Sequence, residues 1–119
     1  VERLEKTLIH GPLGAVLAQK IYNINDEEIL RAIKIHTTGD INMTRLDKVI
    51  FISDFIEPCR DFPGVDELRD KAFKDLDAAI VSAFNSTIKY VIDKGGLLHP
   101  KTIESRNFIL IQRESEGIL

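Results

Sequence analysis

The chain has 119 residues, of which 44% are hydrophobic and 29% are charged, and its formal net charge is −3. This length suits one domain, or most of one, with a modest core, and the composition excludes a disordered polypeptide. The slight acidity argues against a general nucleic-acid-binding protein, because such proteins usually carry a surplus of basic residues.

The cysteine content and the length of the apolar runs indicate the cellular compartment of the protein. The single cysteine, Cys59, excludes an internal disulfide and a cysteine-based zinc site. Apolar runs such as Val49 to Ile52 are far too short to cross a bilayer. We therefore expect a cytoplasmic protein with no membrane partner. The first residue is Val1 rather than methionine, which suggests a processed, truncated or incompletely observed protein.

Apolar residues recur at helical spacing along most of the chain. The first helix is predicted from about Gly11 to Tyr22, with small residues at 14, 15 and 18 that would admit a neighbouring helix. Asn25 is the predicted N-cap of a second helix, in a capping box with Glu28. That helix should end at Gly39, which is free to adopt positive φ.

Four further helices are predicted in the second half. One runs from about Thr44 to Ile56, one is capped by Asp66, one spans about Leu76 to Lys94, and the last begins at Pro100. We therefore expect an all-α fold, a bundle of about six helices, and a single domain over residues 1–119.

Three side chains are candidate metal ligands. Asp54 lies in the apolar segment 49–56, which predicts burial, and a buried carboxylate needs a metal, an ion pair or several donors. His36 ends a helix and could bind a metal or merely cap carbonyl groups. His10 precedes Gly11 and is either a ligand or an exposed capping residue. Two histidines and one aspartate on facing helices suit divalent metals, but hydrogen-bonded structural roles remain open.

Other side chains are candidates for binding phosphate. The turn at Thr37, Thr38 and Gly39 offers hydroxyl groups and free backbone N–H groups to phosphate oxygens. Arg60 and Arg106 carry guanidinium groups, which fork onto phosphate, although each alone could be a surface side chain. Cys59 is interpreted as a filler residue and His99 as part of a surface turn.

Five short motifs, in this order and spacing, resemble the YqeK family of HD-domain proteins over residues 10 to about 110. They are His10-Gly11-Pro12-Leu13-Gly14-Ala15, Ala32-Ile33-Lys34-Ile35-His36-Thr37-Thr38-Gly39, Ser53-Asp54-Phe55-Ile56-Glu57-Pro58-Cys59-Arg60, Phe62-Pro63-Gly64-Val65 and His99-Pro100-Lys101-Thr102 with Ser105-Arg106-Asn107.

The resemblance implies an all-helical HD fold, a centre of two divalent metals (iron in the family, with Mn, Co, Zn or Mg as alternatives) and symmetrical hydrolysis of diadenosine tetraphosphate to two ADP. It implies that His10, His36 and Asp54 are metal ligands, with His36 and Asp54 catalytic. The implied substrate-binding residues are Thr37, Thr38, Gly39, Arg60 and Arg106.

One feature departs from the family pattern: the sequence contains no His-Asp dipeptide. We therefore expect that the chain is the larger C-terminal part of a single HD domain, that the N-terminal helices are missing, and that this fragment alone holds an incomplete metal site. A second copy of the chain is a candidate partner. Two other functions stay open, an HD phosphohydrolase acting on another nucleotide and a non-catalytic helical module that binds nucleotide or protein.

Overall fold

The computed structural model describes residues 10–117, which are helical with no strand among them. The helices are α2 (His10–Tyr22), α3 (Glu27–Lys34), α4 (Arg45–Ile56), α5 (Val65–Lys74), α6 (Leu76–Asp93) and α7 (Pro100–Ser115). The predicted all-α fold is confirmed. Within this part of the chain, no helix has the length and apolar character needed to cross a membrane.

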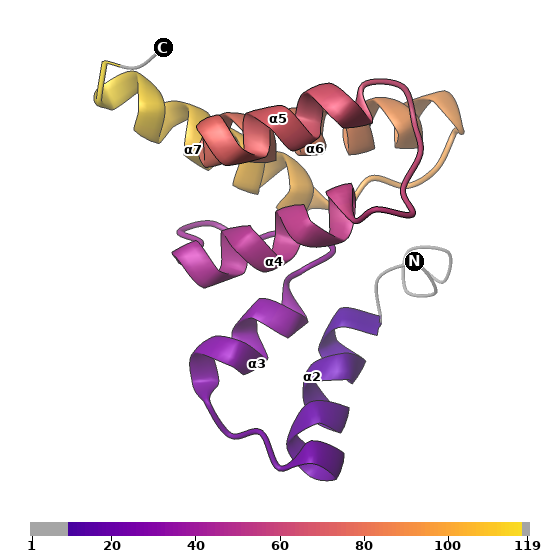
Figure 1. Ribbon diagram of the computed structural model, residues 1–119, viewed down its shortest axis with the longest axis vertical. Helices are drawn as coiled ribbons and strands as arrows, with labels where there is room; N and C mark the ends of the chain where they lie inside the picture. Colours follow the sequence, from indigo (N-terminus) through magenta and orange to yellow (C-terminus); the bar gives the residue numbers. More distant parts are fainter. Residues whose placement is uncertain (1–9, 118–119) are drawn as a thin grey trace.

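Helix α4 lies between two groups of helices (Figure 1). The pair α2 and α3 lies on one side of it, and α5, α6 and α7 lie on the other. Helix α2 packs against α3, α3 packs against α4, and α6 packs against α4, α5 and α7. The first helix of this part of the chain is therefore held mainly through α3.

The hydrophobic core centres on α6. Phe84 and Ile80 are almost completely buried, and the ring centroid of Phe84 lies 4.8 Å from that of Phe51 on α4. Truncating a buried phenylalanine of this kind typically costs about 3–5 kcal/mol. The buried cluster also includes other residues of α4 and α6 and residues from α5, α7 and the α3–α4 connection: Ile35, Met43, Ile52, Leu68, Ala79, Ala83 and Ile109.

Two predicted helix starts differ from those observed. Asp26, rather than Asn25, is the N-cap of α3, and its Oδ1 accepts a hydrogen bond from the backbone N–H of Glu28 at 2.9 Å. Helix α5 begins directly after Gly64, whose φ is +88°, so Asp66 lies in the first turn rather than at the cap. The left-handed conformation of the glycine starts the helix two residues earlier than a side-chain cap would.

The start predicted at Thr44 is confirmed, and it contains a capping box. Thr44 accepts from the backbone N–H of Asp47 at 3.1 Å, and Oδ2 of Asp47 accepts from the backbone N–H of Thr44 at 2.9 Å. The same Oδ2 receives Nη1 of Arg31 from α3. Asp47 is only 1% exposed and Arg31 is 35% exposed, so this partly buried ion pair joins α3 to α4.

The contact between α2 and α3 is made by small residues. Gly11 and Ala18 are buried, and a Cβ atom on Gly14 would lie 3.3 Å from Cγ2 of Ile33. The apolar residues of α2 instead lie exposed to solvent. Leu13 is 48% exposed and Ile21 is 65% exposed. Short side chains at the interface let the two helix backbones approach closely, as the sequence predicted for Gly14 and Ala18.

Candidate functional site

The structure brings two of the predicted ligands together. The rings of His10 and His36 meet edge to face, with their centroids 4.9 Å apart. Nδ1 of His36 lies 2.5 Å from the carbonyl oxygen of Ile33. A carbonyl oxygen can only accept, so Nδ1 is the donor, and this is the tautomer in which the lone pair lies on Nε2.

Local sequence explains why these rings meet. His10 is the first residue of α2, and His36 follows the C-cap of α3, Ile35. Gly11, next to His10, lies against the end of α3: a Cβ atom there would be 2.5 Å from the carbonyl oxygen of Lys34. The glycine therefore permits the close approach that places one histidine beside the other.

Asp54 does not have the environment that the sequence predicted. Its side chain is 49% exposed, so the predicted burial is wrong. Asp47 and Asp54 are seven residues apart, close to two helical turns, and project from nearly the same face of α4. Arg31 of α3 covers that face at Asp47, whereas Asp54 lies near the other end of the helix and pairs with Arg60 at 3.7 Å.

The donor set fits a metal in part. Metal-binding histidines usually donate their second ring N–H to a carbonyl or carboxylate, and His36 does so to Ile33. Imidazole nitrogens and a carboxylate suit first-row divalent ions. Among residues 10–117, however, no three histidine, cysteine or acidic side chains are grouped so that they could hold an ion. The described residues thus supply a histidine pair, and a full centre needs further donors.

The turn after α3 is shaped by packing. Gly39 has φ +72° and is buried, and a Cβ atom on it would lie 2.6 Å from Cζ of Phe84. Its N–H donates to the carbonyl of Ile35 at 2.8 Å, so this group is not free for phosphate as the sequence predicted. Thr38 donates its hydroxyl to the carbonyl of Gly39 at 2.9 Å, whereas the buried hydroxyl oxygen of Thr37 has no partner.

The residue after this turn, Asp40, is held in place by hydrogen bonds. Asp40 receives Nζ of Lys101 from α7 at 3.0 Å and the backbone N–H of Ile41 at 2.8 Å. Burial raises the pKa of Asp40, but these hydrogen bonds and the charges of Lys101 and Arg31 outweigh burial and hold the pKa below its usual value. The connection that follows His36 is thereby fixed to α7.

Arg60 lies on a segment that another arginine holds in place. Arg69 of α5 donates to three backbone carbonyls: Nε to Ile56 at 3.0 Å, and Nη2 to Glu57 at 3.0 Å and to Arg60 at 2.8 Å. The guanidinium of Arg60 is about half exposed. Sequence reasoning missed Arg69, because no local pattern shows that an arginine on the next helix will bind these carbonyl groups.

The remaining candidates have structural partners. Arg106 donates from Nε to Asn85 and from Nη1 to Asn107, and among the described residues no hydrogen bond joins it to Arg60 or to the histidine pair. His99 is the N-cap of α7, where its Nδ1 accepts from the backbone N–H of Lys101 at 3.0 Å. Cys59, in contrast, is a free and exposed thiol, so its interpretation as a filler residue is wrong.

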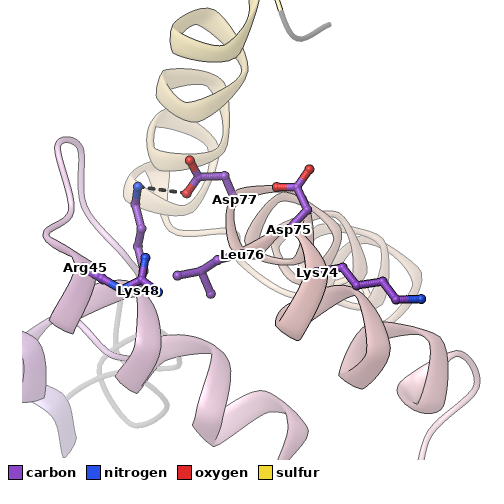
Figure 2. Close-up of a pocket in the computed structure, with 6 residues that line it drawn as sticks. All are labelled: Arg45, Lys48, Lys74, Asp75, Leu76 and Asp77. Carbon is purple, nitrogen blue, oxygen red and sulfur yellow. Dashed lines mark ion pairs between the residues drawn. The ribbon is translucent and has the colours of Figure 1, made fainter.

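A polar hollow of about 340 Å³ lies where α4 faces the junction of α5 and α6 (Figure 2). Lys48 points to Asp77 and pairs with it at 2.8 Å, while Lys74 extends away from them. Asp75 pairs with Arg113 at 2.9 Å. Lys48, Asp75 and Asp77 are thus already paired with protein groups, and Lys74 pairs with Asp70 at 2.9 Å.

No protein-family model matches the chain. A crystal structure from Clostridium acetobutylicum, described as that of an HD superfamily hydrolase involved in NAD metabolism, superposes with a TM-score of 0.85 at 53% sequence identity. The match covers 87% of this chain and 55% of that protein. The helical arrangement is therefore that of an HD-type hydrolase.

The curated relatives are more specific. Symmetrical bis(5′-nucleosyl)-tetraphosphatases from Halalkalibacterium halodurans and Staphylococcus aureus are 41% and 45% identical to this chain over 107 and 103 residues. These matches cover 90% and 85% of the chain but only 57% and 53% of the relatives. By sequence the chain is a relative of these YqeK-type proteins, which confirms the resemblance predicted from its motifs. It spans about half the length of the curated relatives it matches.

Proposed function

We propose that the complete protein is a metal-dependent phosphohydrolase that cleaves a dinucleoside tetraphosphate, such as diadenosine tetraphosphate, symmetrically into two nucleoside diphosphates. The relatives from three bacteria, Bacillus subtilis included, bear the name of this activity. The observation that carries the proposal is the histidine pair, His10 and His36, with His36 oriented by Ile33 so that Nε2 is available as a ligand.

In this proposal His10, His36 and Asp54 each contribute one ligand to a divalent metal centre, and residues outside 10–117 supply the rest. Iron is the proposed metal, since the YqeK family resemblance implies it, and other first-row ions accept the same donors. Bound metal of this kind supplies Lewis-acid polarisation of a phosphoryl oxygen and a water that is acidic near neutral pH.

The residues of this chain would position the substrate. Arg60, about half exposed, can exchange its 3.7 Å pair with Asp54 for phosphate oxygens, which leaves the carboxylate free to bind metal. The hydroxyl of Thr38 can donate to a phosphate oxygen of the substrate once it no longer donates to the carbonyl oxygen of Gly39. Arg106 is a weaker candidate, because its guanidinium is already bound by two asparagine side chains.

Replacement of a histidine in the complete protein tests the proposal. His36→Ala should lower bound metal and hydrolysis by at least about 10- to 100-fold, the scale of effect seen even for groups around a metal ligand. His99→Ala is the matched control, since His99 only caps α7, and it should keep normal metal content and turnover. Metal is counted by elemental analysis and products by chromatography. Normal metal occupancy in His36→Ala would exclude His36 as a ligand.

A second candidate function is hydrolysis of a different nucleotide. The structural relative is described as involved in NAD metabolism, and a relative from Mycoplasma genitalium bears the name "probable nicotinate-nucleotide adenylyltransferase/Ap4A hydrolase". A panel of mononucleotides, dinucleotides and guanosine polyphosphates, assayed for released products, separates the two candidates. A purely binding module would bind no stoichiometric metal, and its unfolding would not respond to chelators.

A further inference from the structure

A cleft of about 570 Å³ opens beside Arg60, and apart from Arg60 none of its lining residues has a function assigned above. Phe55, Arg60 and Phe62, from the end of α4 and the segment after it, form one wall. Thr87, Tyr90 and Asp93 of α6 belong to the other. Figure 1 shows the connection from α4 to α5 close to the C-terminal part of α6. This volume lies in the range of small-molecule sites.

The walls suit a flat heterocycle. The rings of Phe55 and Phe62 meet edge to face with centroids 5.8 Å apart, which fixes an apolar surface on the α4 side. Tyr90 is 64% exposed, and Nζ of Lys94 lies 5.7 Å from the centre of its ring. Aromatic side chains of this kind stack on nucleobases with little dependence on the base. Thr87 and Asp93 add hydrogen-bonding groups to this otherwise apolar cleft.

The charge at one end of the cleft connects it to the candidate metal ligands. Nη2 of Arg60 lies 3.7 Å from Oδ2 of Asp54, so a phosphate group held by Arg60 would lie beside that carboxylate. Arg69 donates a hydrogen bond to the carbonyl oxygen of Arg60, and this bond holds the main chain of that cleft wall in place. A symmetrically cleaved dinucleoside substrate must place a nucleoside on each side of the reacting phosphates.

We propose that this cleft holds one nucleoside of the substrate, with the base between Phe62 and Tyr90 and its phosphate chain leaving past Arg60. The assignment rests on the proposed hydrolysis of a dinucleoside polyphosphate and specifies where half of that substrate binds. The second nucleoside binds elsewhere in the complete protein.

Two substitutions in the complete protein test the cleft. Tyr90→Ala removes one stacking surface, and Thr87→Trp fills the space. Each should raise KM for diadenosine tetraphosphate about tenfold, the order expected for loss of one base stack, and leave kcat within about twofold. The inhibition constant of ADP should rise in parallel. Phe73→Ala is the control, because Phe73 is 90% exposed on α5 and does not line the cleft.

Unchanged KM in Tyr90→Ala, or a fall in kcat at constant KM, overturns the assignment. Should Thr87→Trp not fold, Tyr90→Ala decides alone, since its side chain is largely exposed. A wild-type protein that hydrolyses no dinucleoside polyphosphate refutes the proposed function separately. In that case equilibrium dialysis with ADP tests the cleft: binding that Tyr90→Ala weakens about tenfold supports it, and absence of binding or binding equal in both proteins refutes it.

Discussion

Gly11 lies against the carbonyl oxygen of Lys34 so closely that a Cβ atom at residue 11 would be 2.5 Å from it. That oxygen belongs to the backbone at the end of α3 and cannot move aside cheaply. The contact sets the separation of α2 and α3 at the point where the rings of His10 and His36 meet.

We predict that Gly11→Ala separates α2 from α3 and destabilises the protein by about 1–3 kcal/mol, as overpacking does. Metal content of the complete protein should fall with it, because His10 moves away from His36. Gly14→Ala is the matched control: its Cβ would lie 3.3 Å from a side-chain methyl of Ile33, which can yield. Urea unfolding and elemental analysis measure both variants. Equal metal content in the two would show that the Gly11 contact does not position His10.

Arg69 is expected to position Arg60. A lysine in place of Arg69 should not hold the segment that carries Arg60, because one ammonium group cannot reproduce the planar guanidinium that reaches three carbonyl oxygens. We predict a loss of about 1–3 kcal/mol for both Arg69→Lys and Arg69→Ala, since carbonyl groups lose donors. KM for the nucleotide should rise in both. Full stability in Arg69→Lys would show that a single donor suffices.

The ion pair between Asp47 and Arg31 should be a large local contribution to stability. Asp47→Ala removes a buried carboxylate that also caps α4, and we predict a loss of about 3 kcal/mol, the lower end for broken buried pairs since Arg31 is 35% exposed. A double-mutant cycle with Arg31→Ala, followed by chemical denaturation, measures the coupling. Additive losses from the two single variants would mean that the pair contributes no coupling energy.

Asp75 gives the fold a predicted dependence on acid pH. The hydrogen bonds from Arg113 on α7, together with the N–H of Ala78, hold the pKa of Asp75 below its usual value. A carboxyl group whose pKa is lower in the folded state than in the unfolded state stabilises the fold at pH values above its unfolded pKa, near 3.9. This stabilisation is lost as the pH falls through the pKa of the folded state.

The free energy of unfolding of the wild type should therefore exceed that of Asp75→Asn by about 0.5–1 kcal/mol near pH 6. The difference is modest because Asp75 is 45% exposed. The difference should shrink below about pH 4. Asp70→Asn, which breaks only the exposed pair with Lys74, should change stability by less than about 0.5 kcal/mol. Thermal unfolding across pH 2.5–7, buffered at constant ionic strength, measures all three proteins; a difference that persists undiminished at about pH 2.5 would contradict the assigned role.

Helix positions followed from local sequence. The spacing of apolar residues, together with the helix-starting and helix-ending residues Thr44, Pro58 and Pro100, predicted α4 and α7. This succeeded because caps and backbone restrictions act within a few residues. The motif order also indicated the family, which the relatives bear out. Asn25 was the wrong cap for α3 because Asp26 competes for the same N–H groups one residue later.

Burial and convergence were decided only by the tertiary structure. Asp47 and Asp54 carry the same side chain on nearly the same face of α4, and only the packing of α3 determines that Asp47 is buried and Asp54 exposed. His10 and His36 meet across 26 positions of sequence because Gly11 lets two backbones touch. A spacing rule describes one helix at a time, whereas the distance between two helices depends on which side chains are small enough to lie between them.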